Sequence, residues 1–335
     1  MKNPFVTNGY VSPEYFCDRE KETAKIVSLL TNENNIALIS PRRLGKTDLL
    51  RHCFGQPEIK EHYHTFIIDI YATSSVRDFV NVFGKAVLDE LRPKGKSVWG
   101  TFLNVLASLR SEITFDMNGQ PTWGIGLGAI TNPSATLDEI FSYLNNAGKP
   151  CLIAIDEFQQ ITKYADDPNI EAALRTHIQR CSNAHFVFSG SHRHLMGAMF
   201  TSPARPFYQS VTLINLPPIS VDKYAEFCLR HFERASKHLD TLVVTELYER
   251  FNGITSYMQK VMNILFSMTG TGEICIPSMI DTAINDLLDF SADTYDALLY
   301  QMPEKQRIVF MAIAAEGKAK AISSGDFVRK YKLQS

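Results

Sequence analysis

Short apolar runs alternate with longer amphipathic segments over the first two thirds of the chain. A strand buried on both faces of a parallel sheet is apolar at almost every position, so each short run predicts such a strand. The predicted strands are at 36–39, 65–70, 151–155, 185–188 and 211–216, and the predicted helices between them are at about 18–30, 46–50, 75–92, 97–110, 136–147 and 169–182. Asp18 is the expected N-cap of the first helix. Strands that alternate with helices predict a three-layer α/β sandwich with right-handed crossovers.

Residues 112–128 interrupt this alternation of strands and helices. Apolar and polar residues alternate there on both sides of an Asn118-Gly119 pair. That pattern is typical of a β-hairpin. We interpret the segment as an insertion that decorates the core, and a partner-binding surface is the alternative.

The last third of the chain shows only helical patterns. After Ser220 no run predicts a strand, and Gly270-Thr271-Gly272 interrupts the helices. The predicted helices are at about 220–233, 242–252, 255–268, 277–290, 292–301, 303–315 and 324–331. We therefore expect an α/β core over 1–218 and two helical parts, 219–290 and 291–335.

The segment after the first strand has the pattern of a phosphate-binding loop. Ser-Pro-Arg-Arg-Leu precedes Gly45-Lys46-Thr47, and these last three residues open a helix. Backbone N–H groups and the helix dipole favour an anion at such a helix start, and Gly45 permits close approach of the backbone. Lys46 supplies a charge for the β- and γ-phosphates, and Thr47 supplies a hydroxyl to Mg²⁺. The candidate nucleotide-binding residues are Ser40, Pro41, Arg42, Arg43, Leu44, Gly45, Lys46, Thr47 and Asp48.

One position departs from the motif, because Ser40 stands where its first glycine is usual. A second motif supports the same chemistry. The strand at 151–155 ends in Asp156-Glu157. Asp156 is suited to hold Mg²⁺ through water, and Glu157 to orient or deprotonate an attacking water. The two motifs together predict binding of ATP with Mg²⁺.

Composition narrows the classes of partner. The formal net charge is −2 over 335 residues, so the chain as a whole does not attract nucleic acid. Residues 301–335 differ, with seven basic and three acidic side chains, which indicates either DNA contact or a solvated face. The six cysteines have no paired spacing, which favours a reduced protein without a structural metal. No apolar run is long enough for a membrane span and no signal-peptide pattern is present, so we expect a cytoplasmic protein without membrane contact.

Six segments carry a family resemblance. They read YFCDRE, ISPRRLGKTDLL, LIAIDEFQQI, FSGSHRHLM, ARPFYQS and NGITSYMQ, in that order. In these segments and their order the chain resembles prokaryotic ATPases of the archaeal-type AAA+/STAND class of P-loop NTPases. The resemblance implies an AAA+-like core over 1–218, a helical lid over 219–290 and a winged helix over 291–335. Because the chain stops where a recognition helix should begin, we expect that winged helix to be partial.

The resemblance also implies further site residues. Phe16 and Arg19 become candidates for the base pocket. Ser191, with Ser189 as the alternative, resembles the polar sensor that contacts the γ-phosphate or the attacking water. Arg205 stands where related ATPases place an arginine finger for a neighbouring subunit, and a surface salt bridge is the alternative.

The remaining features of the resemblance are weaker. Arg193 is a second, weaker candidate for the arginine finger. Arg42 and Arg43 are expected to face solvent or to close over phosphate. Two positions depart from the family: Thr255 replaces a usual lid proline, and Lys260 is the nearest cation to the expected second sensor.

These features favour an ATP-binding and ATP-hydrolysing switch that couples its nucleotide state to an unidentified protein partner or to homo-oligomer assembly. The alternative is a DNA-binding ATPase similar to origin-recognition proteins, which would act through the winged helix. A nucleotide-binding scaffold without turnover is a third alternative. Glu157 argues against it, because a pure binder does not need a carboxylate after Asp156.

Overall fold

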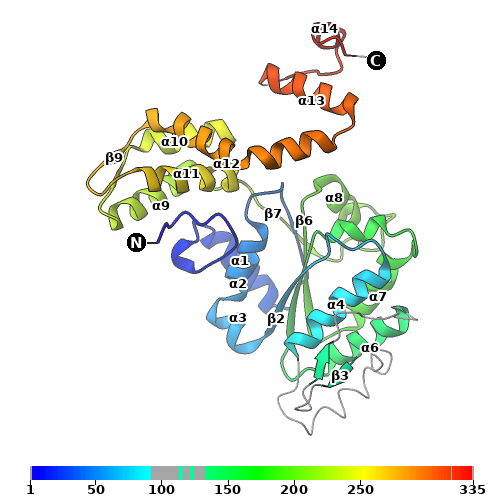
Figure 1. The fold of residues 1–335 in the computed structure, drawn as a ribbon. Coiled ribbons are helices and arrows are strands. Elements are labelled where there is room, and N and C mark those ends of the chain that lie inside the picture. The colour runs from blue at the N-terminus through cyan, green and yellow to red at the C-terminus, as the bar shows by residue number, and fades with distance from the viewer. Residues whose placement is uncertain (1, 92–112, 116–120, 124–132, 318, 334–335) are drawn as a thin grey trace.

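The computed structural model describes residues 2–91, 113–115, 121–123, 133–317 and 319–333 (Figure 1). The helix predicted at 97–110 and the turn at Asn118-Gly119 lie outside the described residues. Within the described part, none of the helices combines the length and the apolar character that crossing a lipid bilayer requires.

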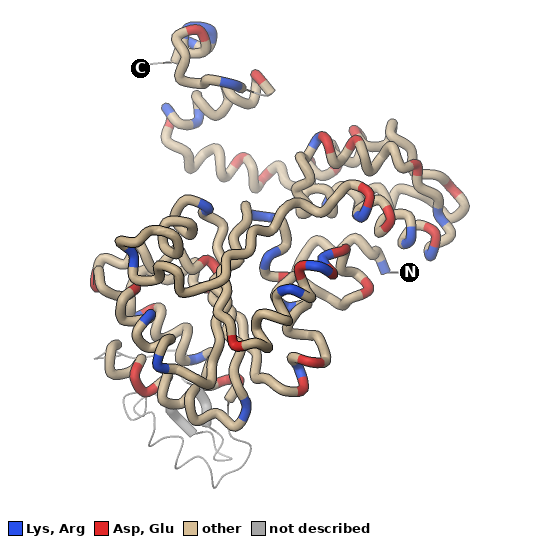
Figure 2. Tube along the Cα trace, turned by 180° about the vertical axis from the view of Figure 1, so that it is seen from behind, with Lys and Arg blue, Asp and Glu red and all other residues tan. Residues whose placement is uncertain are grey.

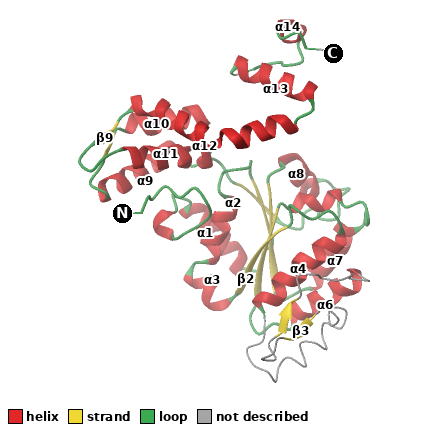
Figure 3. Cartoon of the chain, in the orientation of Figure 1, coloured by secondary structure: helices red, strands yellow, loops and turns green. Residues whose placement is uncertain are grey.

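A five-stranded sheet lies at the centre of the α/β core (Figure 3). Its strands are β1 (Ile36–Ile39), β2 (His64–Asp69), β5 (Cys151–Asp156), β6 (Ala184–Gly190) and β7 (Thr212–Asn215). They pair in parallel in the order β2-β5-β6-β1-β7, which confirms the five predicted strands. Because all the strands are parallel, their carboxyl ends meet at one edge of the sheet. The phosphate loop therefore lies at the same edge as the acidic pair at the end of β5, and β6 lies between them.

Helices cover both faces of the sheet (Figure 1). One apolar cluster joins β1 to α1 (Glu20–Thr31), α2 (Lys46–Phe54) and α3 (Pro57–His62). The opposite cluster joins the sheet to α4 (Val76–Glu90), α6 (Pro133–Asn145), α7 (Ile170–Arg180) and α8 (Arg193–Thr201). Side chains along β1 alternate between these clusters, since Ile36 and Leu38 belong to the first and Ala37 and Ile39 to the second. The predicted three-layer architecture is confirmed.

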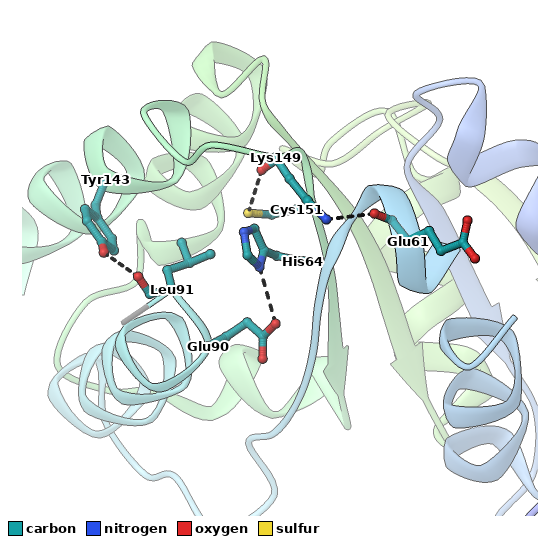
Figure 4. Close-up of polar contacts among 7 residues, drawn as sticks. All are labelled: Glu61, His64, Glu90, Leu91, Tyr143, Lys149 and Cys151. Carbon is teal, nitrogen blue, oxygen red and sulfur yellow. Dashed lines mark hydrogen bonds and ion pairs between the residues drawn. The ribbon is translucent and has the colours of Figure 1, made fainter. Parts of the chain in front are cut away.

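Contacts at the amino ends of the strands fasten the helices far from the phosphate loop (Figure 4). His64, the first residue of β2, contacts Glu90 at the end of α4, with 3.4 Å between Nδ1 and Oε1. The Lys149 ammonium donates a hydrogen bond to the Glu61 carbonyl at 2.7 Å. These contacts hold α3 and α4 against the edge of the sheet opposite the phosphate loop.

A pair of short strands forms a second sheet. β3 (Ile113–Phe115) pairs antiparallel with β4 (Pro121–Trp123), as the hairpin prediction requires.

The prediction of Asp18 as a helix N-cap is wrong, because α1 begins at Glu20 and its N-cap residue is Arg19. Asp18 and Arg19 both have positive φ, 56° and 79°, and this tight turn moves the start of the helix along the chain.

The helical part after the sheet forms its own apolar cluster. Its main helices are α9 (Val221–Arg234), α10 (Thr241–Phe251), α11 (Thr255–Met268) and the first half of α12 (Ile280–Gln301). The amino-terminal segment also joins it, since the Phe5 side chain is fully buried among these helices. Asn263 of α11 fastens this segment, because its side-chain amide donates to the Phe5 carbonyl at 2.7 Å.

Two sequence predictions for this part are wrong. The two helices predicted at 277–290 and 292–301 are the single helix α12, because no glycine or proline near Ser291 interrupts the pattern. The prediction of no strand after Ser220 is also wrong, since β8 (His238–Leu239) and β9 (Ile274–Cys275) form a short parallel pair. Such two-residue strands are too short to leave an alternating pattern in the sequence.

Two further helices, α13 (Glu304–Glu316) and α14 (Gly325–Lys330), follow α12. Basic residues mark α14 near the end of the chain (Figure 2). Lys330 pairs with Glu316 at 2.6 Å, and Arg329 pairs with Asp326 at 2.6 Å. Part of the local positive charge predicted for 301–335 is therefore balanced within these helices.

Candidate active site

A cavity of about 360 Å³ lies at the carboxyl edge of the sheet. Its walls come from the amino-terminal segment, the phosphate loop, the end of β5 and the start of α11. The lining residues in these walls include Tyr10, Phe16, Arg19, Arg42, Arg43, Leu44, Gly45, Lys46, Thr47, Asp48, Asp156, Glu157, Thr255, Ser256 and Gln259. Its volume lies in the range of small-molecule sites in proteins.

The phosphate loop reaches this cavity through two left-handed residues. Arg43 has a φ of 69° and Gly45 a φ of 83°, which curl the chain between β1 and α2. A side chain at Gly45 would meet nothing within 4 Å, so the conformation, and not crowding, requires glycine there. Lys46 and Thr47 follow in the first turn of α2, where backbone N–H groups have no partner inside the helix. The loop therefore presents donors to the cavity.

Lys46 is held inside its own loop. Its side chain is buried, and Nζ donates to the carbonyls of Ser40 at 3.1 Å and Pro41 at 3.3 Å. Burial lowers the pKa of Lys46, although the nearby Asp156 and Glu157 carboxylates act in the opposite direction. An anion in the cavity would offer this ammonium stronger partners than neutral carbonyls do.

Thr47 and Asp156 meet across the two sequence motifs. The Thr47 hydroxyl donates to Asp156 Oδ2 at 2.5 Å, and the backbone N–H of Glu157 donates to Oδ1 at 3.0 Å. No cluster of three or more His, Cys, Asp or Glu side chains suited to a metal exists among the described residues. Mg²⁺ bound with a nucleotide needs only one or two protein oxygens, with phosphates and water completing its shell. The Thr47–Asp156 pair fits that requirement.

Glu157 follows Asp156 in a left-handed conformation, with φ 56° and ψ 39°. Its Oε2 atom accepts hydrogen bonds from the Ser191 hydroxyl at 2.8 Å and from the Gln159 side-chain amide. Arg42 in turn donates from Nε to the Ser191 hydroxyl at 3.4 Å. The structure thus brings the predicted Ser191 to the predicted carboxylate. The contact from Gln159 was not predicted, since no sequence pattern assigns a glutamine two residues after Glu157 to it.

The predicted base-pocket residues both line the cavity. The Phe16 ring stacks on the His52 ring, with centroids 4.4 Å apart. The Tyr10 ring packs edge-on against the Phe16 ring, with centroids 5.6 Å apart. Arg19 is almost fully buried and is already bonded, because it donates to the Pro217 carbonyl at 2.7 Å and pairs with Glu22 at 3.0 Å. A base contact by either residue stays a prediction. Tyr10 also lines the cavity and was missed, because an isolated tyrosine in an irregular segment gives no signal.

Six predicted residues are not among the lining residues of the cavity: Ser40, Pro41, Ser189, Ser191, Arg193 and Arg205. Arg205 donates a hydrogen bond to Glu171 of α7, within the same chain. Burial raises the pKa of Glu171, and Arg205 opposes that change. Ser189 is fully buried in β6, and its hydroxyl has no partner among the described residues. Ser191 is therefore the better placed of the two serines, and the finger role of Arg205 stays a prediction.

The phosphate loop touches the helical part directly. The Arg43 guanidinium lies 4.8 Å from the centroid of the Tyr257 ring, and the Arg43 carbonyl accepts the Ser256 backbone N–H at 3.2 Å. Ser256 is in the first turn of α11, which has no side-chain cap. Thr255 and Gln259 of the same helix line the cavity, whereas Lys260 is not among the lining residues.

The chain is similar to known proteins in sequence and in structure. A family model described as an ATPase domain predominantly from Archaea matches residues 16–261, and a model described as a probable winged helix domain matches residues 293–335. No curated protein matched the chain.

Solved structures share the fold. A Walker-type ATPase of Pyrococcus abyssi has a TM-score of 0.63 and 18% identity, covering 98% of this chain and 87% of that one. The ORC2 protein of Aeropyrum pernix, in ADPNP and ADP complexes, has a TM-score of 0.60 and 14% identity, covering 98% and 82%. The ORC1 protein of Aeropyrum pernix, in complex with DNA, has a TM-score of 0.59 and 13% identity, covering 99% and 81%. At these identities the likeness establishes the fold.

Proposed function

The chain belongs to the family of ATPase domains found predominantly in Archaea, and on this premise we propose that it is an ATP-hydrolysing switch. It would bind ATP with Mg²⁺ in the cavity and couple hydrolysis to the position of its helical part. One observation carries the proposal. The Thr47 hydroxyl and the Asp156 carboxylate lie 2.5 Å apart, on a cavity wall that also holds Lys46 and Glu157.

The chain's own residues can hold a triphosphate at this wall. The first-turn N–H groups of α2 point along the helix axis and would face a bound phosphate, and the helix dipole would add to their effect. The Lys46 ammonium can leave its two loop carbonyls for phosphate oxygens. Thr47 and Asp156 would hold Mg²⁺, directly or through water. Bound ATP with Mg²⁺ would supply the terminal phosphoryl group that accepts a water oxygen.

Glu157 is the residue best placed to accept the proton of that water. It lines the cavity, and both of its protein donors contact the same atom, Oε2. Its Oε1 atom has no protein donor among the described residues. As the water oxygen bonds to the terminal phosphorus, Oε1 would take the water proton. The bond from that phosphorus to the bridging oxygen would break, and ADP would leave with the bonding electrons. General-base help of this kind is worth about 10²–10⁴ in rate.

Arg43 supports a coupling between the nucleotide and the helical part. It belongs to the phosphate loop, and both its guanidinium and its carbonyl contact α11. Any movement of the loop on nucleotide binding is therefore passed to the start of that helix. Nearly complete switching between two states needs a difference in affinity of about 10⁴, or about 5.5 kcal/mol. A ligand that touches both the loop and α11 can contribute such a difference.

Hydrolysis is tested with Glu157→Gln, which keeps the shape of the side chain and removes the base. We expect ATP affinity within about threefold of wild type, measured by calorimetry, because the phosphate-binding residues are unchanged. We expect single-turnover hydrolysis to fall by about 10²-fold or more. Hydrolysis equal to wild type would show that Glu157 is not the catalytic carboxylate.

Coupling is tested at Tyr257 with a matched pair of variants. Tyr257→Leu removes the aromatic face under Arg43, whereas Tyr257→Phe keeps it. ATP should protect the amides of α11 from hydrogen exchange in wild type and in Tyr257→Phe, and should protect them less in Tyr257→Leu. Equal protection in all three proteins would contradict a coupling through Arg43.

DNA binding through the carboxyl-terminal helices is the second candidate function. The winged-helix match over 293–335 favours it, and the ion pairs of Arg329 and Lys330 weigh against it. Fluorescence anisotropy with duplex DNA at several salt concentrations separates the two candidates. A steep salt dependence, with affinity lowered in Lys305→Ala/Arg307→Ala, would favour DNA. Absence of binding at low salt would leave a protein partner or a second copy of the chain as the target.

A further inference from the structure

We propose that Gln159 is a positioning residue that holds the Glu157 carboxylate for catalysis, an inference that rests on the proposed ATPase function. Gln159 lies in the 3-10 helix η4 (Phe158–Lys163), directly after Glu157. Its side-chain amide donates to Glu157 Oε2, the same oxygen that accepts the Ser191 hydroxyl. Gln159 is 3% exposed and does not line the cavity. It therefore acts on the reaction only through Glu157.

The chemistry of the two groups fixes which end of the amide faces Glu157. An ionised carboxylate only accepts hydrogen bonds, so the group that contacts it must be the Nε2 donor. The Oε1 atom of Gln159 is then left buried, without a hydrogen-bond partner among the residues that the structure describes. A buried acceptor without a partner is unfavourable. The folded chain accepts this cost at Gln159, whose amide contacts Glu157.

The neighbouring strand leaves room for this side chain. A Cβ atom at Gly190, the last residue of β6, would lie 2.3 Å from Gln159 Oε1. It would also lie 2.5 Å from the Met196 sulfur atom. A side chain at Gly190 would therefore force the Gln159 amide or the Met196 side chain to move. The same strand leads directly into Ser191, the other donor to Glu157.

Two donors on one oxygen define the orientation of the carboxylate. A single hydrogen bond leaves a carboxyl group free to turn about its last torsion, which is broad in glutamate. Donors from Gln159 and Ser191 reach Oε2 from η4 and from the end of β6, and together they limit that rotation. Glu157 Oε1 is then kept in one place for the proton of the attacking water. Precise placement of a catalytic group contributes to rate independently of substrate affinity.

The test compares Gln159→Met with Gln160→Met in the full chain, with ATP and Mg²⁺ as the probe. The methionine side chain is similar in length to that of glutamine but has no hydrogen-bond donor. Gln160 is the matched control, because it is the next residue and its amide donates to the Thr73 carbonyl at 2.9 Å. We expect Gln159→Met to lower single-turnover hydrolysis about 10- to 100-fold with ATP affinity within about twofold. Gln160→Met should retain most of the activity, and equal losses in both variants would overturn the proposal.

A double variant shows whether Gln159 acts through Glu157. In a Glu157→Gln background, Gln159→Met should cause no further loss of hydrolysis, because the group it positions is gone. A loss of the same factor in both backgrounds would mean that Gln159 only supports packing. A wild-type chain that binds but does not hydrolyse ATP would overturn the proposed function itself, and this role with it.

Gln159→Glu keeps the test decisive if the methionine variant folds poorly, since it preserves the shape of the side chain. The introduced carboxylate cannot donate to Glu157 and repels it at neutral pH. Single-turnover hydrolysis should therefore fall in Gln159→Glu as it does in Gln159→Met. Hydrolysis equal to wild type would overturn the proposal.

Discussion

Replacing Lys46 with methionine should separate the function of this site from the stability of the fold. Lys46 donates to two backbone carbonyls in the structure, and both bonds can be exchanged for bonds to phosphate oxygens. Hydrogen bonds to charged groups are each worth about 1.5–3 kcal/mol. Loss of two such bonds corresponds to about 3–6 kcal/mol, or about 10²–10⁴-fold weaker binding of ATP.

The same substitution should cost the fold little. Burial lowers the pKa of Lys46, so the folded chain holds this proton less well than the unfolded chain does. At neutral pH the ammonium is therefore a burden on the folded state, and a methionine removes it. We expect the free energy of unfolding of Lys46→Met to be at most about 1 kcal/mol lower than that of wild type, or to be higher than it. Any advantage of the variant should shrink as pH rises from the lowered pKa of Lys46 in the folded chain towards about 10.4, the pKa of lysine in the unfolded chain, and should be gone above that pH.

Calorimetry with ATP and Mg²⁺, and urea unfolding at pH 7 and above pH 10, measure these two effects. Lys149→Met is the matched control, because it removes the same charge at the opposite edge of the sheet (Figure 4). Its ATP affinity should equal that of wild type. ATP binding by Lys46→Met that is unchanged would refute the assignment of the site. Destabilisation by several kcal/mol would refute the argument that burial of the ammonium is costly.

Two further predictions concern Mg²⁺ and assembly. Asp156→Asn removes a charge beside the Thr47 hydroxyl, so ATP binding should need about tenfold more Mg²⁺ in a calorimetric titration. An unchanged Mg²⁺ requirement would exclude Asp156 as a metal ligand. If Arg205 leaves Glu171 to serve a neighbouring subunit, hydrolysis per chain should rise with protein concentration, and Arg205→Ala should flatten that rise. Mixed Arg205→Ala and Glu157→Gln chains should then regain activity, because one chain supplies the arginine and the other the carboxylate. No recovery in this mixing assay, with a rate independent of concentration, would identify Arg205 as a structural residue of a monomeric switch.

The sequence by itself determined the features that depend on neighbouring residues. The apolar runs specify strands because a strand covered on both faces must be apolar at nearly every position. The loop from Ser40 to Thr47 can be identified because its chemistry uses consecutive backbone groups at one helix start. Asp156-Glu157 is recognisable because it ends a buried run. The parallel sheet then brings both motifs to the same edge, as the structure confirms.

Only the tertiary structure decided the features that depend on distant segments. Arg205 contacts Glu171, Arg43 contacts Tyr257, and neither pair leaves a pattern along the chain. The division of 277–301 into two predicted helices was wrong for a local reason, since no glycine or proline near Ser291 interrupts α12.

The catalytic carboxylate shows the same division at atomic scale. Its identity follows from its place after a buried strand, but its orientation depends on donors from two other segments. Ser191 directly follows β6. Gln159 belongs to η4, and its amide packs so close to Gly190 that a Cβ atom there would lie 2.3 Å from Gln159 Oε1. Side-chain directions of this kind are fixed by packing between segments, and packing is decided by the folded chain as a whole.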